Sequence, residues 1–195
     1  MQSLIAALAA LIIALAPYNT RRAKDLPPPE LYDAYAASIA TDIAAVVTSQ
    51  PPIPGMSRTQ SAVLLTSVAY HESGFLQSVD SGKRKGDNGR SWCILQLNVG
   101  TAGTVQLDGY RDLTGPDLVA DRSKCLAVGY EMIRRSVASC SAQGMTGADL
   151  LSQYATGHCE RDIPAAQRQW SISQNHTVRA HLKELRDGMK AALSP

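Results

Sequence analysis

The sequence predicts a mainly α-helical protein with at most a small β-hairpin. Of its 195 residues, 45% are apolar, yet the aromatic side chains are only seven Tyr, two Trp and one Phe, a balance that favours helix packing over a β-sandwich. Apolar residues recur at helical spacing in several segments, and no long alternating strand pattern occurs. This length and apolar content suit one ordinary globular domain and exclude a disordered chain.

The chain opens with an apolar run of thirteen residues, Leu4 to Ala16. A membrane span needs about 20 residues, so the run has the length of a signal-peptide core. Pro17 follows it directly, and the nearby basic residues Arg21, Arg22 and Lys24 come after it, which opposes export. We interpret residues 1–16 as a weak export signal or anchor, or as a buried N-terminal helix used in packing or assembly.

Residues 27–29 are three prolines, which predict a stiff joint between a leader, residues 1–29, and a domain over residues 30–195. The first helix of that domain is expected from Glu30 to Thr48, before the proline-rich loop 50–55. Ser57 and Gln60 have the spacing of a capping box, so a second helix is expected from about Arg58 to Ser73, with Gly74 as its stop signal.

Five glycines between residues 80 and 104 predict loops and one small hairpin. Asp121 can then cap a helix over residues 121–139, and a shorter helix is expected from Thr146 to Tyr154, closed by Gly157. Apolar spacing in residues 178–189 predicts a last helix.

Four cysteines and an apolar leader favour an oxidising compartment with two disulfides. In a continuous helix, Cys125 and Cys140 would lie about 22 Å apart, too far for a bond. The helix-compatible pairings join Cys93 to Cys125 or Cys140, and Cys159 to the other. Four buried free thiols are the alternative.

The clearest sign of chemistry lies at the end of the second predicted helix. Glu72 follows Leu65 and Val68 by seven and four residues, so its carboxyl projects from the stripe that faces the core. Partial removal from water favours the neutral form of a carboxyl group, which produces an acid that keeps its proton near neutral pH. The alternative is a carboxylate that fans out at a frayed helix end.

The order of motifs resembles the lysozyme-like fold of goose-type lysozymes and lytic transglycosylases. The resemblance covers about residues 57–170. It consists of a helix ending in Glu-Ser, a Gly-Asp loop at 86–87, the segment Ile94-Leu95-Gln96-Leu97, a long central helix, and the segment 151–157 with its tyrosine. Cys93 stands where a glycine is usual in the family, and Thr156 where an alanine is common.

This resemblance implies cleavage of the β-1,4 bond between N-acetylmuramic acid and N-acetylglucosamine in peptidoglycan strands. Glu72 matches the catalytic acid, and Asp87 matches the loop aspartate thought to position the attacking water in goose-type lysozymes. Asn98 replaces a second aspartate of those enzymes. One carboxylate suffices for a lytic transglycosylase, in which the 6-hydroxyl of the substrate traps the intermediate. We therefore expect that reaction, with hydrolysis as the alternative.

The same resemblance implies substrate-binding residues around the acid. Gln96 matches the glutamine that lines the sugar cleft, and Tyr154 matches the tyrosine whose hydroxyl lies near the acid. Ser73 and Asn98 complete the candidate set, although Ser73 also fits a hydrogen bond at the helix end.

Other function classes are less favoured. The formal net charge of +2 is too small for a protein whose function depends on binding nucleic acid phosphates. The four histidines lack the two-His spacing of metalloproteases, so no metal or cofactor is expected. The basic tip 83–85 is either solvated or a contact for anionic wall components. A non-catalytic wall-binding or assembly protein of the same fold remains the other class, with residues 1–16 in contact with a membrane or with a secretion or phage assembly.

Overall fold

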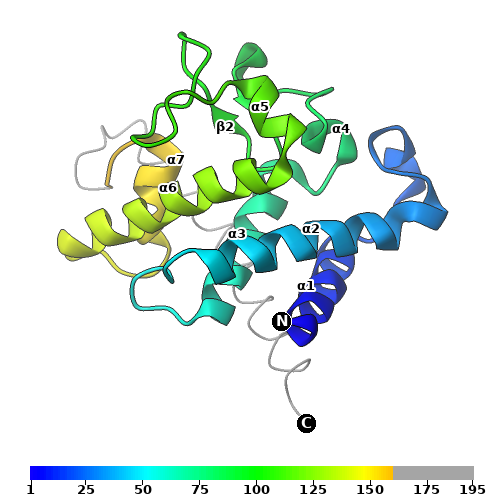
Figure 1. The fold of residues 1–195 in the computed structure, drawn as a ribbon, viewed down its shortest axis with the longest axis horizontal. Helices are drawn as coiled ribbons and strands as arrows, with labels where there is room; N and C mark the ends of the chain where they lie inside the picture. The colour runs from blue at the N-terminus through cyan, green and yellow to red at the C-terminus, as the bar shows by residue number, and fades with distance from the viewer. Residues whose placement is uncertain (160–195) are drawn as a thin grey trace.

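The computed structural model describes residues 1–159 and is mainly helical, as predicted, with one small antiparallel sheet in this range (Figure 1). The helices are α1 (Gln2–Leu15), α2 (Pro29–Ser49), α3 (Arg58–Ser73), α4 (Gln77–Asp80), α5 (Gly115–Ala120), α6 (Arg122–Ala142) and α7 (Ser152–Thr156). Short 3-10 turns occur at η1 (Thr20–Asp25), η2 (Asp87–Gly89) and η3 (Gly147–Leu151), and the strands are β1 (Ser91–Trp92) and β2 (Leu97–Asn98).

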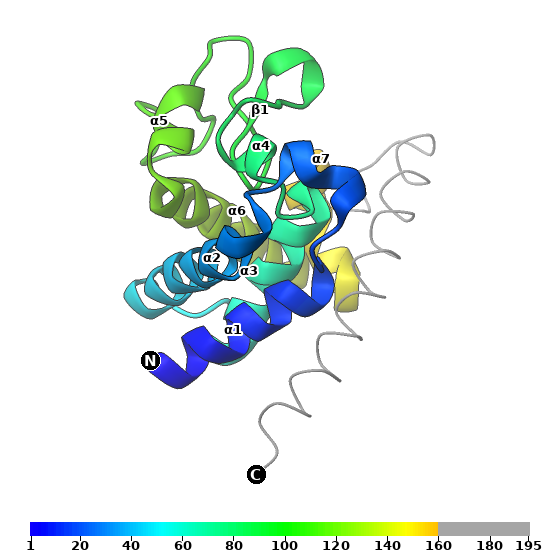
Figure 2. The same cartoon turned by 90° about the vertical axis from the view of Figure 1, so that its right-hand side faces the viewer.

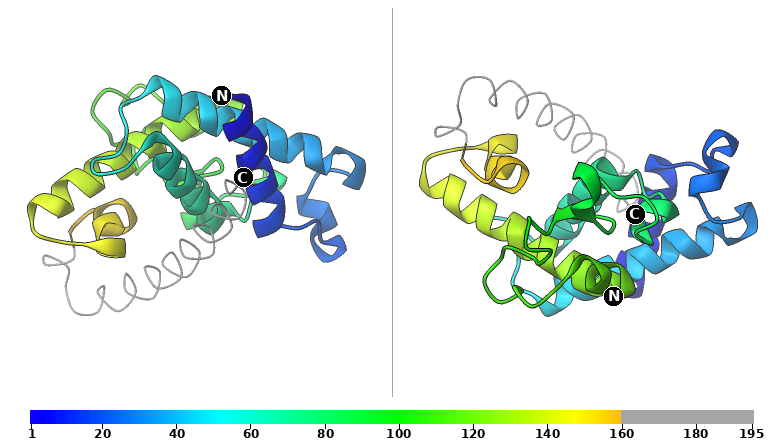
Figure 3. Two further views of the ribbon diagram at one scale, coloured as in Figure 1. Left: turned by 90° about the horizontal axis from the view of Figure 1, so that it is seen from below. Right: turned by 90° about the horizontal axis from the view of Figure 1, so that it is seen from above.

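The apolar N-terminal segment forms α1, which packs across α2 and also contacts α3 (Figures 2 and 3). Its inward residues Leu8, Leu11 and Ile12 are buried. The Tyr32 hydroxyl on α2 donates a hydrogen bond to the Ala16 carbonyl at the end of α1. Residues 1–16 are thus arranged as the alternative of a buried helix predicts, and export through them stays a prediction.

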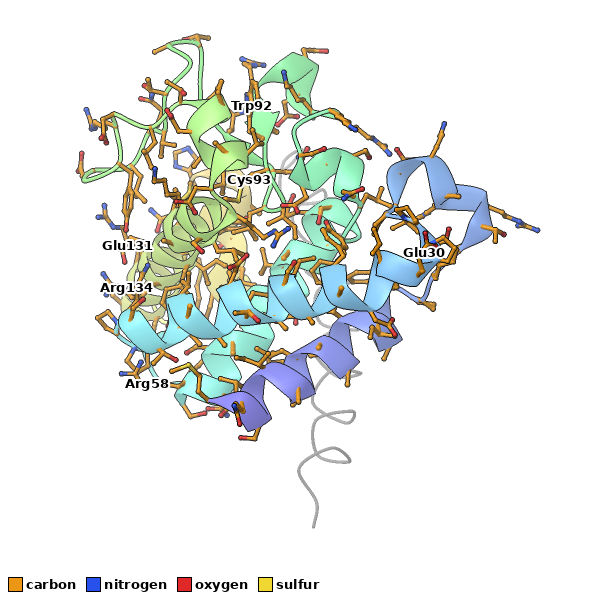
Figure 4. All side chains as sticks on the ribbon, turned by 45° about the vertical axis from the view of Figure 1, so that its right-hand side comes forward. Glu30, Arg58, Trp92, Cys93, Glu131 and Arg134 are labelled. Carbon is orange, nitrogen blue, oxygen red and sulfur yellow. A yellow bond between two sulfur atoms is a disulfide. The ribbon has the colours of Figure 1, made fainter. Side chains whose placement is uncertain are left out.

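The second predicted helix, α3, has the expected ends. The Ser57 side chain accepts from the Gln60 backbone N–H while the Gln60 side chain accepts from Ser57, so the capping box at the start of α3 is confirmed. Gly74 ends that helix in the left-handed region at φ 58°, which glycine adopts without steric cost. Arg58 ties α3 to α2 by donating to the carbonyls of Val47 and Thr48 (Figure 4).

The long helix α6 lies against α2, and the loops between α4 and α5, residues 81–114, form a loop lobe above it in Figure 1. Its Asp121 cap accepts from the Lys124 N–H, as predicted. A Cβ at Gly129 would lie 2.2 Å from Cδ1 of Leu95, so only glycine lets this buried leucine rest on the helix. Disulfides Cys93–Cys125 and Cys140–Cys159 join both ends of α6 to the neighbouring loops and select one of the two helix-compatible pairings.

A charged cluster joins α2, α4 and the start of α6. The Arg122 guanidinium donates to both carboxylate oxygens of Asp80, at 2.6 to 3.1 Å, and to Asp42 at 2.8 Å. The Tyr35 hydroxyl also donates to Asp80, at 3.1 Å. Burial opposes the charge on Arg122, but its hydrogen bonds to Asp80 prevail and raise the pKa of the guanidinium. Arg122 and its two carboxylate partners therefore stay charged and satisfy one another's hydrogen bonds.

Some elements differ from the sequence prediction. The expected helix from Thr146 to Tyr154 is divided into η3 and α7, although Gly157 closes it in the left-handed region as predicted. The sequence analysis missed α5, whose Thr114 and Asp117 form a second capping box. The last predicted helix, residues 178–189, lies outside the described residues. Within residues 1–159, no helix combines the length and apolar character required to span a bilayer.

We expect Leu8→Ala to lower the free energy of unfolding by about 2–5 kcal/mol, because its side chain is fully buried under α2 and α3. Denaturant unfolding of the full chain measures this. The control is Ser3→Ala, an exposed position on the same helix, which should change little. Equal stability of the two variants would show that α1 does not pack on the domain.

Candidate active site

The C-terminal end of α3 presents Glu72 next to an anchored residue, Ser73. Ser73 is buried, and its hydroxyl donates to the Ala69 carbonyl at 2.7 Å and accepts from the Phe75 N–H at 3.2 Å. Gly74 then turns the chain away from the helix. Ser73 therefore fixes the helix end beside Glu72, and its hydroxyl is already used by the backbone. This positioning role is the alternative that the sequence offered for Ser73, and its contact with substrate stays a prediction.

The segment after α3 has an unusual backbone. Five non-glycine residues have positive φ between 48° and 61°, and all lie between positions 75 and 96: Phe75, Asp87, Asn88, Cys93 and Gln96. Such conformations cost free energy and persist only where the surrounding structure imposes them. These five residues follow Glu72 closely in the chain. The surrounding contacts, including the Cys93–Cys125 disulfide, therefore impose the shape of this segment.

Asp87 is held by a pair of residues that face each other across the hairpin. The register of β1 and β2 places Ser91 opposite Asn98. The Ser91 hydroxyl donates to Oδ2 of Asp87 at 2.5 Å, and Nδ2 of Asn98 donates to the same oxygen at 3.4 Å. Oδ1 of Asn98 accepts from the Gly100 N–H at 2.7 Å, which orients the amide. The glycine-rich sequence predicts a mobile loop here, but these bonds fix the Asp87 carboxylate.

The Glu72 carboxyl is partly buried, and this burial raises its pKa from 4.5 to about 7. The negative charge of Asp87 adds to the rise, so the two predicted carboxyl groups lie within electrostatic reach of each other. Glu72 can therefore carry a proton near neutral pH. A carboxyl group in this state is suited to general acid catalysis.

Tyr154 approaches the same group from α7. Its hydroxyl donates to the Leu95 carbonyl at 3.2 Å. Burial raises the pKa of Tyr154 well above its usual value, and the Glu72 charge raises it further. The phenol thus stays protonated and near the acid, where the resemblance to lysozyme-like enzymes predicts it.

Gln96 is half-buried in the turn between the strands. Its Nε2 donates to the Cys93 carbonyl at 3.1 Å. A Cβ on Gly86 would lie 2.6 Å from its Oε1, so glycine at 86 is required for the amide to fit against the loop. In this arrangement Gln96 braces the hairpin that carries Asp87.

A hollow of about 550 Å³ begins at Gly89, two residues after Asp87, and is lined by Trp92, by the loop 99–103 and by the start of α5. Trp92 forms part of it and packs over Gly115, where a Cβ would lie 2.2 Å from the ring. Figure 4 shows Trp92 on the loop lobe and Cys93 closer to α6. The sequence analysis missed Ser91 and Trp92 as site residues, because their positions depend on hairpin register and not on a motif.

A second cavity, of about 560 Å³, opens at the Arg122 cluster between α2, α4 and α6. Its guanidinium and the two carboxylates that it contacts are already paired with one another. We assign that cavity to the packing of the helices, and the group around Glu72 to chemistry.

Comparisons of this chain with protein-family models, curated proteins and solved structures found no match. The site is therefore interpreted from its own residues, of which the structure brings Glu72, Asp87 and Tyr154 within electrostatic reach and links Asn98 to Asp87.

We expect Glu72→Gln to raise stability relative to the unmodified protein as pH increases. The pKa of Glu72 is about 7 in the folded protein against an ordinary value of 4.5, so the folded state binds this proton more tightly. Its stabilising contribution is complete below pH 4.5 and is lost as the pH rises through 7.

Thermal unfolding of both proteins at pH 4 and at pH 8 measures the effect, because these values lie below and above the two pKa values of Glu72. The melting temperature of the variant should exceed that of the parent more at the higher pH. Asp108→Gln, at an exposed surface position, is the control and should show no such trend. A constant difference between the proteins would indicate an ordinary carboxyl group at position 72.

Proposed function

We propose that the protein is a peptidoglycan-cleaving glycosidase of the lysozyme-like fold, acting as a lytic transglycosylase with Glu72 as its catalytic acid. The observation that carries the proposal is a partly buried carboxyl group with a pKa of about 7 beside a second, fixed carboxylate. Glycoside cleavage uses such a pair, one protonated and one charged. The order of the motifs along the chain supports the same family of reactions.

In the proposed reaction, Glu72 gives its proton to the glycosidic oxygen between N-acetylmuramic acid and N-acetylglucosamine. The bond from that oxygen to the anomeric carbon breaks, and positive charge develops on the sugar ring. The 6-hydroxyl of the same muramic acid residue then attacks the anomeric carbon, and its proton passes to the Glu72 carboxylate. The product is an anhydro sugar, and Glu72 is ready for another cycle.

The neighbours of Glu72 suit these steps. Burial and, to a lesser extent, the charge of Asp87 keep the proton on Glu72 before cleavage, and the charge of Asp87 favours the positive charge that develops afterwards. The hydroxyl of Tyr154 stays protonated near the acid, where its hydrogen bond to the Leu95 carbonyl holds it. The hollow that begins at Gly89 and includes Trp92 provides space for further sugar units along the strand.

Hydrolysis is the second candidate, and one observation favours it. Both hydrogen bonds to Asp87 fall on Oδ2, and within residues 1–159 no hydrogen bond is made to Oδ1. A water bound to Oδ1 could attack the anomeric carbon in place of the 6-hydroxyl. The amide at Asn98 favours the transglycosylase, because the second aspartate of goose-type lysozymes is absent here.

The two disulfides suit the exported setting that peptidoglycan cleavage requires, in the periplasm, the envelope or outside the cell. A non-catalytic wall-binding protein of this fold would need no carboxyl group with a raised pKa. Activity therefore separates the two classes.

We expect Glu72→Gln to abolish release of soluble muropeptides from purified cell walls, because an amide of the same shape cannot donate the proton. Mass spectrometry of the products from the unmodified protein should show anhydro ends. Binding to the walls should persist in the variant. Undiminished release by Glu72→Gln would contradict the proposed role of this residue, and reducing ends would assign the reaction to a hydrolase.

Asp87→Asn should reduce the cleavage rate less than about tenfold near pH 7 and even less near pH 5. Removing the Asp87 charge lowers the pKa of Glu72, so fewer molecules carry the proton at neutral pH, whereas near pH 5 the acid stays protonated. Initial rates at both pH values measure this, with Asp108→Asn as the control. A loss on the order of 100-fold at both pH values, with unchanged melting temperature, would assign Asp87 to positioning a water.

A further inference from the structure

We propose that two basic segments beside Glu72 form one cationic face that binds the carboxylates carried along a glycan strand. This inference rests on the proposed function and adds the chemical class of the substrate to it: an acidic glycan and not a neutral one. The face consists of six exposed residues, Arg21, Arg22 and Lys24 in η1, and Lys83, Arg84 and Lys85 after α4.

A small apolar cluster brings η1 against α4. Leu26 and Tyr32 pack with Leu76 and Val79, separately from the main core. Two views show η1 beside α4 (Figures 1 and 2). The first basic group is therefore held on the side of the molecule where α3 ends.

The second basic group is held on the same short helix. The Arg84 N–H donates to the Ser78 carbonyl of α4 at 2.7 Å, which folds the loop back on that helix. The Lys85 ammonium lies 3.8 Å from the centre of the Trp92 ring. Both basic groups therefore flank α4.

Both groups also reach the candidate active site. A Cβ on Gly74 would lie 3.5 Å from Nη1 of Arg22, so this guanidinium is beside the turn that follows Glu72. Lys85 is adjacent to Gly86, which packs against Gln96, and is two residues from Asp87. One basic group therefore lies beside the turn after Glu72, and the other continues into the loop that carries Asp87.

The positive charge of the chain is concentrated in this face. Residues 20–25 contain one acidic side chain, Asp25, so the two segments together carry five positive charges in excess, whereas the whole chain carries only +2. The rest of the protein is therefore net negative. Within residues 1–159, none of the six basic side chains forms an ion pair, in contrast to Arg122 and Arg134. Exposed, unpaired charges of one sign concentrate ligands of the opposite sign.

The position of the face selects its ligand. A neutral chitin-like strand gains nothing from five positive charges, whereas every muramic acid residue bears a lactyl group that ends either in a carboxylate or in a peptide with its own carboxylates. A strand bound at Glu72 and Asp87 would lie close to both basic groups. An anionic lipid surface would also be attracted, but it would require no such placement around the acid.

The test measures binding in a Glu72→Gln background, which stops turnover. Two variants each remove two charges, Arg22→Gln with Lys24→Gln, and Lys83→Gln with Arg84→Gln. The matched control, Arg111→Gln with Lys124→Gln, removes two exposed charges elsewhere. The ligands are glycan strands with stem peptides, the same strands after amidase treatment, which leaves only lactyl carboxylates, neutral chitohexaose, and vesicles containing phosphatidylglycerol.

Each variant of the face should weaken strand binding about threefold or more at about 0.05 M salt, and the difference should vanish near 0.5 M. Chitohexaose binding and the control variant should be unaffected. A larger effect on untreated than on amidase-treated strands would assign the contact to the stem peptides, and an equal effect would assign it to the lactyl carboxylates.

The inference is overturned if the face variants match the control, if they lose chitohexaose equally, or if only vesicle binding falls. Wall cleavage by otherwise unmodified protein is measured separately. Cleavage without charge-dependent binding removes this inference alone, and charge-dependent binding without cleavage removes the proposed function alone.

Discussion

The bond between Cys93 and Cys125 anchors the hairpin loop to the long helix α6, and the geometry of the candidate site depends on that anchor. Leu95 continues it by resting directly on Gly129 of the same helix. Between α3 and α5 the chain has little regular structure and five strained residues, and its hydrogen bonds are mostly those of local turns. The two anchors fix the position of these turns on α6. Through them, Asp87 is fixed relative to α3, and the Leu95 carbonyl is placed to accept from Tyr154.

The site also places a cost on stability that the surrounding structure has to offset. A carboxyl group whose pKa is raised by burial destabilises the folded state whenever it ionises. In the proposed reaction the same burial lets Glu72 act as the acid, so both effects have one origin. Around it, the Arg122 cluster and two disulfides contribute rigidity without contacting the reacting groups. This division of roles is typical of enzymes, in which the functional group is less stable than its frame.

The sequence predicted those features of the structure that depend on residues close together in the chain. The capping box at Ser57 and Gln60, the stop at Gly74 and the position of the Glu72 carboxyl group on the stripe that faces the core all follow from spacing within one helix. The fixed state of Asp87 could not be predicted in this way, because it depends on Ser91 and Asn98 meeting across the hairpin. Pairing of Cys93 with Cys125 was likewise open, since it depends on which loop lies over the start of α6.

The N-terminal segment contacts the part of the structure that carries the cationic face, so the position of the domain boundary bears on function. A boundary at residue 30 treats residues 1–29 as separable, yet Ile13 packs against the apolar cluster that holds η1 on α4. The Tyr32 hydroxyl also binds the Ala16 carbonyl at the end of α1. Loss of α1 would remove both contacts and leave η1 held on α4 by Leu26 and Tyr32. If the cationic face binds substrate, α1 therefore contributes to function through packing, and cleavage of the leader would weaken the support of that face.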